Sequence, residues 1–149
     1  MGVGALFPRS ALLLARLFLG LVFIAASAEK IVRPEAFAAV VLNYRILPEF
    51  LVNPAALLLP WTEAVVGLAL LAGVLLPGAA LVAAGLMGVF FSALLFNVAR
   101  GLDIHCGCFT LEVTGEPLTW WYLLRDSGLL ALSVYVLARA LRGSPASSR

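Results

Sequence analysis

Charge is scarce in this sequence, and that scarcity sets the class of protein. Of the 149 residues, 12% are charged and 63% are hydrophobic. A soluble domain carries roughly 25% charged residues, and its core cannot absorb this much apolar surface. The sequence therefore predicts an all-α integral membrane protein. A net charge of +2 is too small to indicate nucleic acid or an acidic substrate as a partner.

The common catalytic and ligand-binding motifs are also missing. The sequence contains no glycine-rich phosphate loop, no zinc-ligand set and no Ser/His/Asp signature. Histidine occurs once and cysteine twice, all three within the segment His105-Cys106-Gly107-Cys108-Phe109. Any chemistry that needs sulfur or imidazole must therefore use this one segment.

Four apolar stretches are long enough to cross a bilayer core, which takes about 20 residues per helix. They cover roughly residues 10–28, 55–76, 79–99 and 118–140. Pro77-Gly78 predicts a tight turn between the second and third stretches. The stretches predict a four-transmembrane-helix bundle.

A short additional helix is predicted after the first crossing. Residues 29–54 place Phe37, Val40, Val41 and Tyr44 near helical spacing, which is typical of a helix lying at the membrane interface. We assign residues 1–142 to a single membrane domain and expect residues 143–149 to form a disordered tail.

Four crossings put both termini on one side of the membrane. Arginine and lysine counts are nearly equal on the two sides, so they do not fix the orientation. A cycling cysteine pair belongs where oxidation is possible. We therefore predict a multi-pass protein of the bacterial cytoplasmic membrane with Cys106–Cys108 on the extracytoplasmic side. A cleavable signal peptide ending at Ala26-Ser27-Ala28 is the alternative for the first stretch, but Arg16 interrupts its apolar run.

Polar side chains from several helices are expected at one depth, below the cysteine segment. The expected set is Glu63, Asn97, Arg100, Arg125 and Asp126. Ionisable groups within a membrane are costly and commonly line a functional site. The structural alternative is that Glu63 pairs with Arg125, or Arg100 with Asp126, to hold the bundle together.

The Cys-Gly-Cys segment admits three interpretations. A disulfide closing so short a loop removes little unfolded-state entropy, so it is a poor static crosslink. The small ring is strained, and strained disulfides are easily reduced, which favours a redox pair. The residues His105, Cys106 and Cys108 can also bind a soft metal, although three adjacent ligands leave the shell incomplete. In the redox interpretation, His105 lowers a thiol pKa or moves a proton.

Electron balance limits the redox interpretation. One cysteine pair holds two electrons, and the sequence offers no second pair to pass them on. Electrons that arrive from a partner dithiol must leave to another acceptor, and a quinone is the two-electron acceptor available in a membrane. The alternative is a non-catalytic membrane subunit or a soft-metal carrier.

The sequence resembles the MauE/DoxX group of four-helix membrane proteins. The matching pieces are RLFLGLVFIAASAEK, LPWTEAVVGLALLAG, NVARGLDIHCGCF and RDSGLLAL, within about residues 12–135. Thr110 departs from the pattern, since the family usually has glycine after C-G-C-F. The resemblance implies a role in disulfide formation or electron supply for exported proteins, beside a thioredoxin-like partner. It also implies a site formed by Glu63, Asn97, Arg100, Cys106, Cys108, Arg125 and Asp126.

Overall fold

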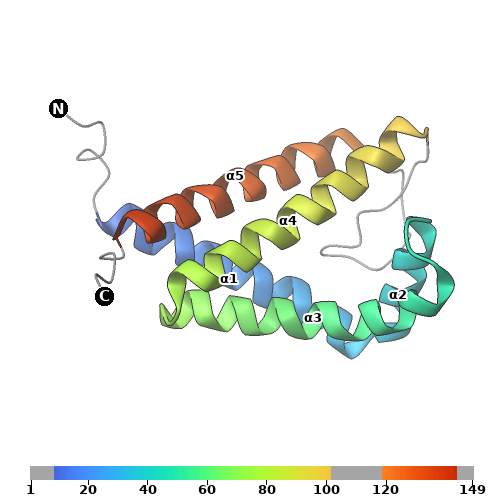
Figure 1. Cartoon of the computed structure of the whole chain (residues 1–149), viewed down its shortest axis with the longest axis horizontal. Helices are drawn as coiled ribbons and strands as arrows, with labels where there is room; N and C mark the ends of the chain where they lie inside the picture. Colours follow the sequence, from blue (N-terminus) through green and yellow to red (C-terminus); the bar gives the residue numbers. More distant parts are fainter. Residues whose placement is uncertain (1–8, 102–118, 144–149) are drawn as a thin grey trace, which may run out of the picture.

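The computed structural model describes residues 9–101 and 119–143, which form five helices and no strand. The helices are α1 (Arg9–Val32), α2 (Pro34–Asn43), α3 (Glu49–Ala72), α4 (Leu76–Ala99) and α5 (Thr119–Gly143). The four long helices run along one elongated bundle, and the short α2 lies at one end of it (Figure 1). The predicted all-helical fold and the short helix after the first are thus confirmed.

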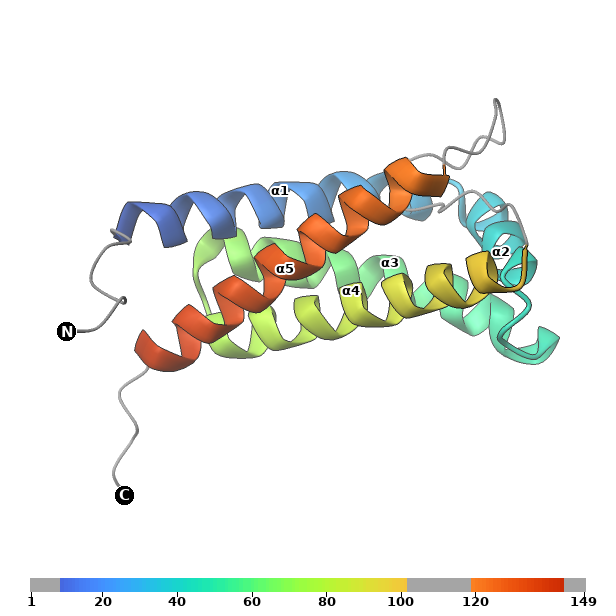
Figure 2. The ribbon, with the colours of Figure 1, turned by 90° about the horizontal axis from the view of Figure 1, so that it is seen from above.

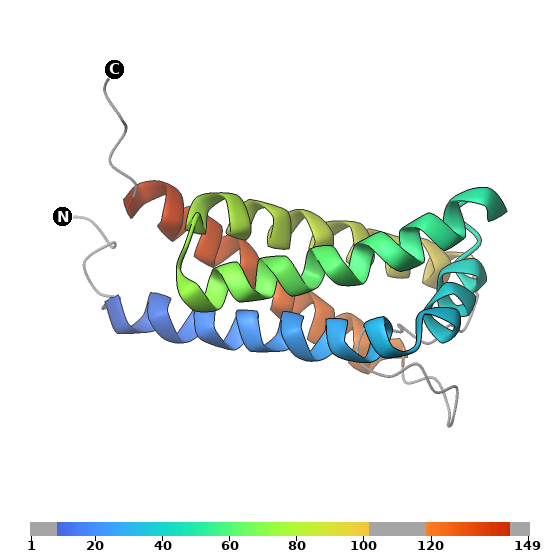
Figure 3. The ribbon, with the colours of Figure 1, turned by 90° about the horizontal axis from the view of Figure 1, so that it is seen from below.

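The long helices are arranged as two pairs. α1 packs mainly against α3, and α4 packs mainly against α5. Figure 2 shows α5 and α4 from one broad side of the bundle, and Figure 3 shows α1 and α3 from the opposite side. α1 begins and α5 ends at the end of the bundle far from α2. Consequently α4 ends and α5 begins near α2, at the same end as the C-terminus of α1.

The α1–α3 pair is held together by a close backbone contact. A Cβ added at Gly20 would lie 3.0 Å from the carbonyl oxygen of Gly67, and a Cβ added at Gly67 would lie 3.0 Å from that of Gly20. Only glycine permits backbones to approach this closely, as in other membrane helix pairs. The neighbouring Leu19 and Leu70 are fully buried.

The α3–α4 hairpin turns earlier than the sequence predicted. The turn is formed by Gly73, Val74 and Leu75, while Pro77 already lies in the first turn of α4. Gly73 ends α3 in the left-handed conformation (φ 73°), which glycine adopts without strain. The guanidinium carbon of Arg16 lies 2.9 Å from where a Cβ of Gly73 would be. A cation here faces the negative end of the α3 dipole, which fits a structural role for Arg16.

The fold is that of a membrane protein. Within the described residues, α1, α3 and α4 are long and apolar enough to cross a membrane. Large apolar side chains such as Phe18, Trp61 and Val89 are exposed on their outer surfaces, as expected of helices that face lipid. α5 has sufficient length but carries Arg125 and Asp126 and does not meet the same criterion. Its crossing therefore remains a prediction.

Candidate functional site

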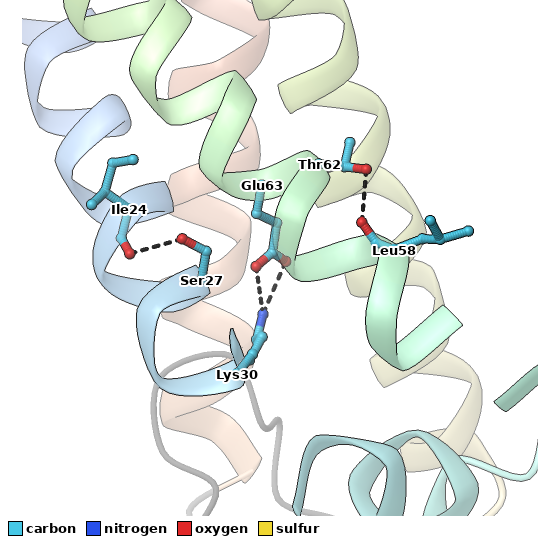
Figure 4. A network of polar contacts seen from close by, with 6 residues as sticks. All are labelled: Ile24, Ser27, Lys30, Leu58, Thr62 and Glu63. Atoms are coloured by element: carbon cyan, nitrogen blue, oxygen red, sulfur yellow. Dashed lines mark hydrogen bonds and ion pairs between the residues drawn. The ribbon is translucent and has the colours of Figure 1, made fainter. Parts of the chain in front are cut away.

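A buried ion pair joins α1 to α3 near the α2 end of the bundle. The ammonium of Lys30 donates hydrogen bonds to both carboxylate oxygens of Glu63, each at 2.9 Å (Figure 4). Each side chain is only 3% exposed. Lys30 lies in the last turn of α1, and Glu63 lies in the middle of α3. Both charges are thus withdrawn from solvent and held in one fixed geometry.

The surroundings of this pair are polar on one side and aromatic on the other. Ser27, one turn before Lys30, donates its hydroxyl to the carbonyl of Ile24 at 2.9 Å (Figure 4). The Lys30 ammonium lies 5.0 Å from the ring centroid of Phe37 and 5.4 Å from that of Phe90. These distances are in the range of cation–π attraction. Lys30 therefore contacts side chains from α2, α3 and α4.

A second ion pair lies on α5, and its carboxylate lines a cavity next to the first pair. Arg125 donates to Asp126 from Nη2 at 2.8 Å and from Nε at 2.9 Å. Asp126 is buried, and it lines a cavity of about 20 Å³ together with Lys30 and Glu63. A cavity needs roughly 10–15 Å³ of this kind of volume to hold one water molecule. We call Lys30, Glu63, Arg125 and Asp126 the charge cluster; its charges sum to zero, and its cavity has room for a single water.

Asn97 and Arg100 lie at the C-terminal end of α4. Asn97 is fully buried and donates from Nδ2 to the carbonyl of Ala93 at 2.9 Å. Its Oδ1 atom is buried with no hydrogen-bond partner in the described part of the chain. Arg100 is exposed and lies 5.2 Å from the ring centroid of Phe96. Buried polar atoms are usually paired, so Asn97 offers an acceptor to a group that enters this end.

Tyr44 adds a hydroxyl at the same end of the molecule. It caps the C-terminus of α2 and is half-buried. Burial, and after it the negative charge of Asp126, raises the pKa of the Tyr44 phenol above its ordinary value. The phenol therefore keeps its proton across the physiological range.

The structure changes the expected ion pairs. In the described residues, Glu63 pairs with Lys30 and Asp126 pairs with Arg125, in place of the Glu63–Arg125 and Arg100–Asp126 pairs considered from the sequence. The predicted site residues Glu63, Asn97 and Asp126 are buried at one end, whereas Arg100 lies at its exposed rim. The predicted residues His105, Cys106 and Cys108 lie outside the described residues. The predicted roles of these seven residues and of Arg125 stay predictions.

Two contributors were not predicted as site residues. Lys30 is absent from the predicted set of site residues, and Tyr44 was predicted only as part of the apolar spacing of the short helix. The signal for Lys30 was available, since it is the only lysine in the chain and ends a long apolar run. Its burial could not be seen, because that depends on how α1 is rotated against α3.

Taken together, the fold and site define a helical membrane protein with charges buried in its bundle. Comparison with known protein families then shows which family the chain belongs to. The family described as "Methylamine utilisation protein MauE" matches residues 8–139. The chain belongs to the MauE family. The resemblance to MauE predicted from the sequence is therefore confirmed, while the broader DoxX grouping stays a prediction.

Individual relatives agree with this family. A "Methylamine utilization protein MauE" of Paracoccus denitrificans is 40% identical over 133 residues, covering 89% of this chain and 71% of the relative. The protein of the same name from Methylophilus methylotrophus is 42% identical over 125 residues, covering 83% of this chain and 66% of the relative. The chain thus spans about two thirds of the length of these relatives. No solved structure gives a significant match.

Proposed function

We propose that this protein is a membrane thiol–disulfide oxidoreductase. Its Cys106–Cys108 pair exchanges electrons between an extracytoplasmic thioredoxin-like or client protein and a membrane quinone. The observation that supports the proposal best is the charge cluster. It gathers buried ionisable groups from α1, α3 and α5 at the end of the bundle where α4 ends and α5 begins. The chain between α4 and α5, which contains both cysteines, leaves and re-enters the described structure at that end.

The reaction balances in two steps. A partner dithiol reduces the Cys106–Cys108 disulfide by thiol–disulfide exchange, which leaves the partner as a disulfide and this pair as a dithiol. The dithiol then gives two electrons and two protons to a quinone. The pair returns to the disulfide and the quinone leaves as quinol. His105 can accept a thiol proton during either step.

The charge cluster fits a supporting role in this chemistry. Both oxygens of Glu63 are bonded to Lys30, so Glu63 acts as the counter-ion that keeps the ammonium in place. Preorganised charges in a dry site stabilise negative charge that develops on a reacting group. Arg125 and Asp126 add a second fixed pair, and Asp126 lines the water-sized cavity together with Lys30 and Glu63.

The same proposal includes the membrane arrangement. We expect α5 to cross the membrane as the fourth helix, with Arg125 and Asp126 facing the bundle. We also expect the α2 end to be extracytoplasmic. The names of the relatives refer to methylamine utilisation. We propose that this chain serves such a system as an accessory membrane protein that handles thiols of an exported client.

The test is quinone reduction by the purified protein in detergent, with a reduced thioredoxin-fold protein as electron donor. We expect turnover in the wild type and none in Cys108→Ser. Arg9→Gln, far from the α2 end, serves as the control that keeps activity. An inert pair in the wild type, together with stoichiometric retention of zinc or copper, would replace the redox function by soft-metal binding.

A further inference from the structure

An apolar pocket lies between α2, α3 and α4, beside the charge cluster. Its volume is about 160 Å³, and its walls include Val40 from α2, Leu59 from α3 and Val89 from α4. Pockets that enclose a whole drug-sized ligand measure roughly 300–1,000 Å³. The pocket is therefore large enough for one ring and too small for an entire lipid.

Tyr44 is the one polar side chain among the described residues that line this pocket. Its hydroxyl is held in the protonated form by burial, which raises its pKa. Binding sites for apolar ligands commonly pair hydrophobic walls with a small number of placed polar groups that fix orientation. A ring with a carbonyl oxygen matches this combination better than a plain hydrocarbon chain does.

A positive charge stands directly behind the aromatic wall of the pocket. Phe37 and Phe90 line the pocket, and the Lys30 ammonium lies 5.0 and 5.4 Å from their ring centroids. Phe90 also lines the cavity of the charge cluster. Since charge interactions are strong where water is excluded, negative charge developing on a ring in the pocket is stabilised by this ammonium.

The pocket continues into a groove on the outer surface of α4. The groove has a volume of about 680 Å³ and shares Ile46, Val89 and Ala93 with the pocket. Gly85 and Gly88 form part of it, and a Cβ added at either would meet nothing within 4 Å. α4 is one of the helices able to cross the membrane, so the groove opens toward lipid. A flexible apolar tail can leave the pocket along it.

We propose that the pocket takes the ring of a prenylated quinone and that the α4 groove takes its tail. The inference rests on the proposed function for the source of electrons, and it locates the acceptor of that function. The ring lies against Phe37 and Phe90, with its carbonyl edge on the side of Tyr44. The quinone binds beside the charge cluster and not between its ion pairs.

The test uses two photoreactive azido-quinones, one with a long prenyl tail and one without a tail, on the full chain in detergent. Labelled residues are mapped by mass spectrometry. We expect both probes to label residues 37–47 and 89–93. Gly88→Leu fills the groove and should weaken labelling by the long-tailed probe by about tenfold, because the tail loses apolar contact. It should leave the tail-less probe unchanged. Ala93→Phe narrows the pocket mouth and should weaken both.

Gly128→Leu is the matched control, because a Cβ at Gly128 on α5 also meets nothing within 4 Å and the residue lines neither space. It should change neither probe. If labelling in Gly88→Leu and Ala93→Phe equals that of the wild type, the proposal is overturned. The proposal is also overturned if excess phospholipid displaces the probes as completely as unlabelled quinone does, because the groove then binds lipids in general.

The same probes separate this inference from the proposed function. Labelling is also measured on a chain in which both cysteines are changed to serine, where the pocket should bind as before. If the probes label the pocket as expected but the wild type reduces no quinone with thiol donors, the oxidoreductase function is rejected and the quinone pocket is retained. Cysteine-dependent turnover with labelling confined to other helices would reject the pocket and keep the oxidoreductase.

Discussion

The two ends of the bundle differ in what fills the space between the helices. Far from α2, the space is filled by Leu19, Leu70 and Val136 and by small residues of α4, with the α1–α3 backbones in contact at Gly20 and Gly67. Near α2, it is filled by ion pairs, aromatic rings and an orphan amide oxygen. The close-packed end explains how the fold is held, and the charged end is where we place the proposed chemistry.

Burial of charge has a cost that the close-packed end avoids. Removing ions from water costs several kcal/mol per ion, and a buried pair is weak evidence of stability by itself. Natural proteins accept such costs mainly at functional sites. The predictions below test this difference between the ends, beginning with the largest expected effect.

Breaking the Lys30–Glu63 pair should destabilise the fold most. Glu63→Gln removes the carboxylate that is bonded to the buried Lys30 ammonium, which costs about 3–5 kcal/mol. The measurement is thermal unfolding in detergent. In the double variant Lys30→Met/Glu63→Leu, two apolar side chains replace the pair, and most of the lost stability should return while activity does not. Equal instability of the double variant would show that the pair itself holds the fold.

Crowding the close-packed end should have the next largest effect. A Cβ at Gly67 would lie 2.9 Å from Ile24 Cγ1 and 3.0 Å from the Gly20 carbonyl oxygen. Gly67→Ala should therefore destabilise the fold by about 1–3 kcal/mol, the usual cost of overpacking. Gly128→Ala is the control, since its Cβ meets nothing; it should gain a few tenths of a kcal/mol from helix propensity. If both variants unfold alike, the α1–α3 contact is not tight.

Asp126→Asn should affect activity more than stability. Its partner Arg125 is 21% exposed, so the guanidinium can extend toward the surface when the carboxylate is lost. We expect a stability loss of about 1–2 kcal/mol, smaller than that of Glu63→Gln, because the remaining charge is less buried. Quinone reduction should fall at least tenfold. A variant with normal turnover would exclude Asp126 from the site.

Tyr44→Phe should have the smallest effect on stability, and its characteristic sign should appear at high pH. The pKa of Tyr44 in the folded protein lies above its ordinary value of 10.0. As pH rises past that value, the unfolded chain loses the phenolic proton and the folded chain keeps it. The wild type therefore loses unfolding free energy above about pH 10, by at most about 1.4 kcal/mol per pH unit from this group. Tyr44→Phe should lose less unfolding free energy over the same pH range. If the two proteins give parallel curves of unfolding free energy against pH, the raised pKa of Tyr44 is contradicted.

The helices themselves could be predicted from the sequence, because long apolar runs need few other signals. Their limits could not be predicted as well. α3 begins at Glu49 and contains Pro54 and Pro60, whereas the apolar pattern placed its start near residue 55. Proline within a membrane helix is tolerated where packing satisfies the freed backbone groups, and packing is not visible in the sequence.

The sequence predicts the depth at which the polar residues of the candidate site lie, but not which of them form ion pairs. Intramembrane polarity singled out Glu63, Asn97 and Asp126, and the structure buries all three near one end. The partner of Glu63 depends on the rotation of α1, which directs Lys30 inward. The apolar pocket depends on how α2 packs against α3 and faces side chains of α4. Neither is encoded in a local pattern.

The most direct test of the central claim is a single-turnover measurement. The protein is reduced, freed of reductant and mixed without oxygen with a short-chain quinone, and the quinol formed is counted. One cysteine pair carries two electrons, so the account predicts about one quinol per chain and none from Cys108→Ser. Quinol formation equal in the two proteins, or absent in both, would contradict it.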